Sequence, residues 1–277
     1  MAVDYLSLWN AQHEAANRQK QIFSDGKSFW EDSQNVSRFL DRLFDKDRAR
    51  IKNQLARMQI PKGSSVLDIG AGPGTLAVPL SRAGCFVTAV EPSKHMRSAM
   101  QEYRNIMHAP EIQEIPCRWE DVDATDIGNY DVVIASLSLG LDDIGASLLK
   151  MDAVARNTVH LFWFLSPPSW AEVNAALWPQ LHGTEFAFEP RADLLWSCLC
   201  QLGIYPNLFV EHVEKERRTA AEDEIISHYC RRLCIREEWQ QKIAAAYVRD
   251  HIAADAELCI SGVSKTAHIW WEKNSHW

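Results

Sequence analysis

The chain has 277 residues and a formal net charge of −8, with 47% hydrophobic and 24% charged residues. This apolar content is enough to build a core, which excludes a mainly disordered chain. The acidic balance disfavours nucleic acid as a partner, because phosphate backbones are bound by basic surfaces. The length fits one large α/β domain, or one domain with a small cap.

The sequence also bears on where the protein resides. The longest strongly apolar run, at 161–165, is far too short to span a bilayer, and the N-terminus carries Asp4 and lacks the basic stretch of a secretory signal. Seven cysteines are an odd number, without the spacing of a disulfide framework or a zinc site. We therefore expect a cytoplasmic protein with no membrane partner and no metal.

The first sixty residues are predicted to be helical, because apolar residues recur on one face at 36–44 and 51–58. From residue 65, short β-branched runs alternate with amphipathic helices, which predicts a parallel sheet with right-handed crossovers. The predicted strands are 66–69, 86–90, 112–117, 131–135 and 158–165, and the predicted helices between them are 75–82, 93–107 and 144–154.

The C-terminal third is less regular. Helices are predicted near 171–181 and 192–202, and strands at 208–213 and 267–271. A capping box at 219–222 marks the start of further helices between the two late strands. Two late strands around such a helical insertion predict an antiparallel pair at one edge of the sheet. We expect a helical cap at 1–62 and a Rossmann-like domain at 63–277, with a helical insertion at about 219–256.

A glycine-rich loop follows the first predicted strand, with the sequence Asp68-Ile69-Gly70-Ala71-Gly72-Pro73-Gly74. Glycines allow a sharp turn and close approach of a ligand, and the next helix offers free N–H groups, so this loop predicts a nucleotide-like ligand. Asp68 would repel a pyrophosphate and attract an amino group and a sulfonium. At the end of the second strand, Glu91 can accept both hydroxyls of a ribose.

These motifs resemble the class I S-adenosylmethionine-dependent methyltransferases, in particular the small-molecule branch called type 11. The resemblance covers about 65–165 and implies a doubly wound α/β fold: a seven-stranded, mostly parallel sheet with an antiparallel edge strand, covered by N-terminal and inserted helices. It implies methyl transfer from S-adenosylmethionine to a small-molecule acceptor by in-line displacement, catalysed mainly by positioning.

The resemblance also implies which residues hold the cofactor. Pro92 and Ser93 would line the adenine, Trp119 or Glu120 would flank it, and Asp121 could accept a hydrogen bond from its amino group. The loop after the fourth main strand would lie beside the methionine end. The full implied set is Asp68, Gly70, Ala71, Gly72, Gly74, Glu91, Pro92, Ser93, Trp119, Glu120, Asp121, Ser136 and Leu137.

The acceptor pocket, by the same resemblance, is built from the N-terminal helices and the late insertion. Aromatic walls there could hold a cationic or planar acceptor. The candidates are Tyr5, Trp9, Trp30, Trp163 and Trp170. His13 and His160 are candidate bases, but a lone histidine is more often structural, and the family has no universal catalytic residue. The catalytic residue is therefore left open.

Three other functions compete with this one. A nicotinamide-dependent oxidoreductase is disfavoured because the glycines at 70, 72 and 74 are one residue tighter than the dinucleotide G-x-G-x-x-G pattern. A non-catalytic S-adenosylmethionine-binding protein fits the same motifs. A methyltransferase acting on RNA is disfavoured by the net charge. The sequence leaves the oligomeric state open, with a homodimer among the options.

Overall fold

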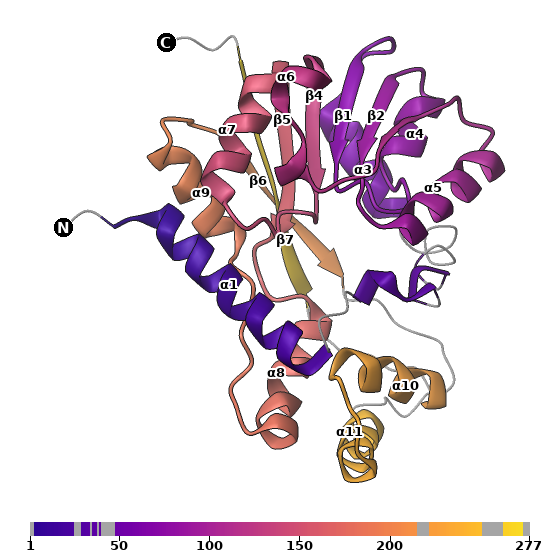
Figure 1. Cartoon of the computed structure of the whole chain (residues 1–277), viewed down its shortest axis with the longest axis vertical. Helices are drawn as coiled ribbons and strands as arrows, with labels where there is room; N and C mark the ends of the chain where they lie inside the picture. The colour runs from indigo at the N-terminus through magenta and orange to yellow at the C-terminus, as the bar shows by residue number, and fades with distance from the viewer. Residues whose placement is uncertain are drawn as a thin grey trace.

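The computed structural model describes residues 3–24, 29–33, 35–37, 39, 48–214, 222–250 and 263–273. Its centre is a seven-stranded sheet with the strand order β3-β2-β1-β4-β5-β7-β6 (Figure 1). The strands are β1 Ser65–Ile69, β2 Phe86–Val90, β3 Gln113–Ile115, β4 Tyr130–Ser136, β5 Ala155–Phe164, β6 Asn207–Glu214 and β7 Val263–Glu272.

The first five strands pair in parallel, and β7 pairs antiparallel with both β5 and β6. The predicted fold class, a mostly parallel sheet with an antiparallel edge, is confirmed. Strand order reverses at β1, which has β2 on one side and β4 on the other. In doubly wound sheets a ligand binds at this reversal, outside the carboxyl ends of the strands.

Helices cover both faces of the sheet. One layer is α3 Arg48–Met58, α4 Ala77–Arg82 and α5 Lys94–Ile106, and the other is α1 Tyr5–Ser24, α7 Ile144–Val154 and α9 Ala192–Gln201. Successive strand residues point to opposite faces, so Val66 enters the first layer's core and Leu67 the second's. Two buried faces explain why these strands are apolar runs rather than alternating patterns.

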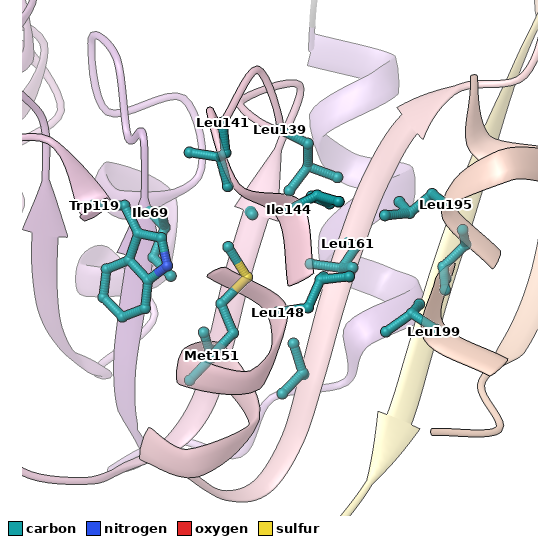
Figure 2. Packing of buried hydrophobic residues seen from close by; sticks show 14 of the residues in the cluster. Ile69, Trp119, Leu139, Leu141, Ile144, Leu148, Met151, Leu161, Leu195 and Leu199 are labelled. Carbon is teal, nitrogen blue, oxygen red and sulfur yellow. The ribbon is translucent and has the colours of Figure 1, made fainter. Parts of the chain in front are cut away.

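Figure 2 shows the second layer's core. Leu148 and Met151 of α7 and Leu195 and Leu199 of α9 converge near Leu161 of β5, and all five are fully buried. Burying a Leu or Met side chain contributes about 1.5–3 kcal/mol, so this layer fixes α7 and α9 firmly on the sheet. The strand ends that carry the site therefore rest on a rigid core.

A third core lies beyond the carboxyl ends of the strands. It joins α8 Ser169–His182, α10 Glu222–Arg232 and α11 Glu238–Asp250, in the lower part of Figure 1. The predicted insertion at 219–256 contains α10 and α11, and the segment after β5 supplies α8. We call these three helices the cap, a name that below refers to them alone and not to the N-terminal segment 1–62. Part of the predicted helical stretch 36–44 and of the capping box lies outside the described residues.

Two element boundaries differ from the sequence prediction. The helix predicted at 75–82 begins at Ala77, because residues 72–76 form turns that include the left-handed Gly74. The strand predicted at 112–117 shortens to 113–115 at the sheet edge, where only one neighbouring strand pairs with it. Within the described residues, no helix combines the length and apolarity that crossing a membrane requires.

Candidate active site

The glycine loop lies at the reversal point of the sheet. Gly70 and Gly72 have φ values of 66° and 57°, in the left-handed region that favours glycine. The N–H groups of Gly70 and Ala71 donate to the carbonyl oxygen of Val90, at 2.8 and 3.2 Å. The loop is thus fastened across to the end of β2, where Glu91 follows.

Glu91 connects the loop to the start of α5. Its Oε2 accepts the Gly72 N–H at 2.9 Å, and its Oε1 accepts the Ser93 N–H at 2.8 Å. Burial raises the pKa of the Glu91 carboxyl, and these two hydrogen bonds and the charge of Arg97 oppose that rise. Each carboxylate oxygen keeps a second lone pair, so Glu91 can also accept hydroxyls from a ligand.

Asp68 is the second acid of the site and is only 2% exposed. Burial raises its pKa from 3.8 to about 7; the nearby charge of Glu91 adds to this, and a backbone hydrogen bond from Ala77 opposes it. A buried carboxyl of this kind is poised between its two charge states at neutral pH. A cationic ligand group beside it would favour the ionised form.

The raised pKa predicts how stability depends on pH. The folded state holds the Asp68 proton more tightly than the unfolded state, so this stabilisation is present at low pH and is lost as pH rises through 7. Between pH 8 and pH 5.5 it increases the free energy of unfolding by about 2 kcal/mol. Buried histidines change stability in the opposite direction over this pH range, so urea denaturation should show the gain as a difference: the change from pH 8 to pH 5.5 is about 2 kcal/mol more stabilising in the wild type than in Asp68→Asn. An equal change in the two proteins would contradict the assignment.

The loop after β4 forms the other wall. The Ser138 hydroxyl donates to the carbonyl oxygen of Ile69 at 2.6 Å, and Leu137 has a φ of 57°, which is unusual for a residue with a side chain. The Leu137 N–H donates to Phe162 at the end of β5. This wall is therefore held to both neighbouring strands, in a strained conformation of the kind that gathers at functional sites.

One cavity of about 1920 Å³ runs from this loop to the cap. Ten of the residues assigned to the cofactor line it: Asp68, Gly70, Ala71, Gly72, Glu91, Pro92, Trp119, Glu120, Ser136 and Leu137. The acidic pair, the glycine backbone and the β4 loop therefore face one space.

Three residues assigned to the cofactor do not line the cavity, and the structure gives each a different surrounding. A Cβ on Gly74 would meet Met100 and Val78, so this glycine serves helix packing. Ser93 caps α5 by accepting the Met96 N–H. Asp121 is exposed, at the end of a short 3₁₀ turn, η2 Trp119–Asp121. A role of these three residues at the cofactor stays a prediction.

Comparison with known proteins agrees with this geometry. Residues 66–158, which carry the glycine loop, Glu91 and the β4 loop, match the methyltransferase domain family. The chain carries a class I S-adenosylmethionine-dependent methyltransferase domain. In this fold the ligand binds where the strand order reverses, which is where Asp68, Glu91 and the glycine loop lie.

Known proteins align with most of the length of this chain. An uncharacterized protein of Haemophilus influenzae is 28% identical over 233 residues, which span 83% of this chain and 84% of that protein. A structure from Anabaena variabilis, assigned to the methyltransferases of an antibiotic biosynthesis pathway, aligns with a TM-score of 0.55 and 18% identity over 79% of this chain and 96% of its own. A cyclopropane-fatty-acyl-phospholipid synthase-like protein of Lactobacillus casei aligns with a TM-score of 0.55 and 14% identity over 84% and 93%. These structures share the fold.

Three of the five aromatic residues predicted for the acceptor pocket line the methyltransferase's cavity: Trp30, Trp163 and Trp170. The other two do not. Trp9 is fully buried and packs on Trp163, with ring centroids 6.2 Å apart. Tyr5 lies in the first turn of α1 and is partly exposed, and its backbone N–H donates to Gln201. Trp9 and Tyr5 therefore do not line the cavity, and their contact with an acceptor stays a prediction.

The two candidate bases also separate. His160 lies in the sheet, does not line the cavity, and pairs with His268 through a hydrogen bond of 3.0 Å. Burial lowers the pKa of His160 to about 4. Its surroundings are those of a structural histidine, and the structure gives its candidacy as a base no support. His13 of α1, in contrast, lines the cavity although it is only 3% exposed.

His13 has a partner that sequence reasoning missed. Its Nδ1 lies 2.7 Å from Glu189 Oε2, and its Nε2 lies 2.7 Å from the Asn17 amide. Burial alone would raise the pKa of Glu189, but the His13 hydrogen bond and Lys20 hold it below its ordinary value. Glu189 is in a loop, 176 residues from His13, so no spacing in the sequence could have linked the two.

Proposed function

We propose that the methyltransferase passes the methyl group of S-adenosylmethionine to a small-molecule acceptor held between the glycine loop and the cap. The observation that carries this proposal is the single cavity of about 1920 Å³. Small-molecule sites usually measure about 300–1,000 Å³. The cavity therefore has room for a cofactor and an acceptor side by side.

The residues that line the glycine-loop end of the cavity would hold the cofactor. Asp68 fits a cationic amino group, the Gly70–Gly72 backbone allows close approach, and Glu91 fits a ribose. S-adenosylmethionine supplies, when bound, a methyl group on an already activated sulfonium leaving group. The protein's task is then to align the acceptor with that methyl group and to exclude water.

The acceptor end would be closed by aromatic faces. Trp163 is fixed by its own hydrogen bond, donating from Nε1 to the Pro190 carbonyl oxygen at 2.7 Å. Trp30 and Trp170 come from distant parts of the chain and line the same cavity. An acceptor enclosed by such walls is a small molecule rather than a nucleic acid, in line with the chain's acidic balance.

We further assign His13 the role of proton acceptor. A Cβ on Gly140 would lie 3.2 Å from His13 Cε1, so the ring lies against the loop that follows β4. That loop begins with Ser136 and Leu137, assigned to the methionine end of the cofactor. Glu189 would hold the proton on Nδ1, which leaves Nε2 to accept one from an acceptor hydroxyl or amine in place of the Asn17 hydrogen bond.

The test is a transfer assay with methyl-labelled S-adenosylmethionine and a cell extract separated into small-molecule, protein and RNA fractions. We expect the label to appear in the small-molecule fraction. Label in the protein or RNA fraction would contradict the acceptor class. Absence of transfer, with the cofactor bound, would favour a non-catalytic binding protein.

The same assay tests the His13 assignment. We expect His13→Ala to lower the transfer rate by about 10²–10⁴-fold while leaving the affinity for S-adenosylhomocysteine nearly unchanged. Glu189→Gln should lower the rate less, because it weakens the orientation of the ring. His95→Ala, an exposed histidine on α5, is the matched control. A His13→Ala variant with wild-type turnover would remove His13 from the reaction.

We also propose a cytoplasmic location. The six cysteines within the described residues are all free, and most are only partly buried. Such thiols persist in a reducing compartment. Several of them also have a pKa raised by burial, which keeps them protonated and unreactive.

A further inference from the structure

The cap end of the cavity holds Arg231, a cation for which the described residues supply no ion-pair partner. Arg231, in the last turn of α10, donates from Nη1 to Ser227 Oγ at 2.6 Å. Its Nε and Nη2 are buried and have no hydrogen-bond partner. None of the ion pairs among the described residues includes Arg231. The C-terminal end of the helix dipole stabilises the positive charge of Arg231, but it gives the buried Nε and Nη2 groups no hydrogen-bond acceptor.

A second unpartnered group comes from the neighbouring helix. Asn174 of α8 is only 4% exposed, and its Oδ1 is buried without a hydrogen-bond partner. Both Asn174 and Arg231 line the cavity. Their helices share the third core, and they meet where the Arg232 guanidinium of α10 lies over the Trp170 ring, one turn before Asn174 on α8. Buried polar groups are nearly always hydrogen-bonded, so two such groups on residues that line one cavity point to a missing ligand.

The charges that line the cavity are unevenly placed. Asp68 and Glu91 lie at the glycine loop, and Glu120 and Asp142 bind Arg118 close to it. Two more acids that line the cavity, Glu31 and Asp32, lie at the end of η1 Phe29–Glu31 and directly after it. This segment lies beside α5, because the Ser93 Oγ donates to the Trp30 carbonyl oxygen. Acidic charge is therefore concentrated towards the cofactor end.

Basic charge is added at the cap end. Arg232 follows Arg231 on α10, and its guanidinium lies 4.2 Å from the centroid of the Trp170 ring. Both residues line the cavity with Trp170. Glu189, the acid from the loop after α8, is already paired with His13 and Lys20. The cap end thus offers a cation and a flat aromatic surface together.

We propose that Arg231 and Asn174 bind a carboxylate group of the acceptor. The proposal rests on the proposed function and names its substrate class: small, planar carboxylic acids. Nε and Nη2 form the side edge of the guanidinium, whose two parallel donors match a carboxylate. The unpartnered Asn174 Oδ1 is an acceptor and would accept from a hydroxyl or amine beside the carboxylate, while its Nδ2 group can donate to the carboxylate itself. Because the edge is covered in the structure, a carboxylate reaches it when neighbouring side chains move aside.

The experiment compares two probes of equal shape and different charge. Benzoate and benzamide are titrated into the full chain, alone and saturated with S-adenosylhomocysteine, and binding is followed by tryptophan fluorescence. We expect benzoate to bind at least about tenfold more tightly than benzamide, as for a charged hydrogen-bond pair. Equal binding of the two probes would overturn the proposal.

Variants then locate the effect. Arg231→Gln should remove the preference for benzoate, Arg231→Lys should keep part of it, and Asn174→Ala should weaken it. Arg249→Gln on α11, an exposed arginine paired with Glu222, is the matched control and should change nothing. A preference that survives in folded Arg231→Gln would also overturn the proposal.

The test separates this proposal from the function on which it rests. Titration with S-adenosylhomocysteine should give the same affinity in Arg231→Gln and in the wild type, because Arg231 lies at the cap. If the wild type fails to bind that compound, the proposed function fails. The benzoate preference of the unliganded protein then still decides whether the carboxylate site exists.

Discussion

Gly70→Ala is expected to destabilise the protein by about 3 kcal/mol. A Cβ on Gly70 would lie 2.4 Å from Ser138 Cβ, far inside contact distance. Ser138 cannot easily retreat, because its hydroxyl is bonded to the carbonyl oxygen of Ile69. Overpacking typically costs about 1–3 kcal/mol, and a left-handed residue with a Cβ costs about 1–2 kcal/mol more. Urea denaturation measures the loss.

Gly72→Ala is the matched control for this prediction. Gly72 has a similar φ of 57°, but a Cβ there meets no atom within 4 Å. Only the conformational strain remains, about 1 kcal/mol. The added methyl group would instead reduce the affinity for the cofactor, since Gly72 lines the cavity. Equal destabilisation by the two substitutions would show that the contact with Ser138 does not limit the loop.

Glu91→Ala is expected to weaken binding of S-adenosylhomocysteine by about 1.5–3 kcal/mol, or roughly 10- to 150-fold. The substitution removes the acceptor for a ribose and the partner of two backbone N–H groups, those of Gly72 and Ser93. Glu91→Gln keeps one good acceptor oxygen and should lie between the wild type and Glu91→Ala. Isothermal titration calorimetry measures the three affinities.

Two controls make the Glu91 result interpretable. Circular dichroism and thermal unfolding must show that Glu91→Ala is folded, since freeing two N–H groups also lowers stability. Glu102→Gln, at an exposed acid of α5 that does not line the cavity, removes a carboxylate without touching the loop. Unchanged affinity in folded Glu91→Ala would exclude Glu91 from the cofactor site.

Local patterns allowed the sheet and the cofactor loop to be predicted. The strands β1, β2 and β4 are short, mostly apolar runs, and both helical layers show their buried faces in the sequence. The glycine loop and Glu91 are adjacent to strand ends, so the strand prediction alone brings them together. The differences at Gly74 and Ser93 arise because a residue within a binding motif can serve helix packing or capping.

The acceptor side could not be predicted in the same way. His13 meets Glu189, and Arg231 shares a cavity with Asn174, through tertiary contacts between distant segments. No periodicity marks such pairs. Trp9 was placed in the pocket because aromatic residues suit pockets, yet it fills the core beneath Trp163. His160 and His268 show the same effect, because a buried pair inside a sheet has no signature in the sequence.

The central claim is that the cavity binds S-adenosylmethionine through its glycine loop and acidic pair. The most direct measurement is calorimetric titration of the purified protein with S-adenosylmethionine and S-adenosylhomocysteine, with NADH as the comparison ligand. We expect micromolar binding of both sulfur compounds and no binding of NADH. Binding of NADH alone, or of none of the three, would contradict a cofactor site for S-adenosylmethionine at the glycine loop.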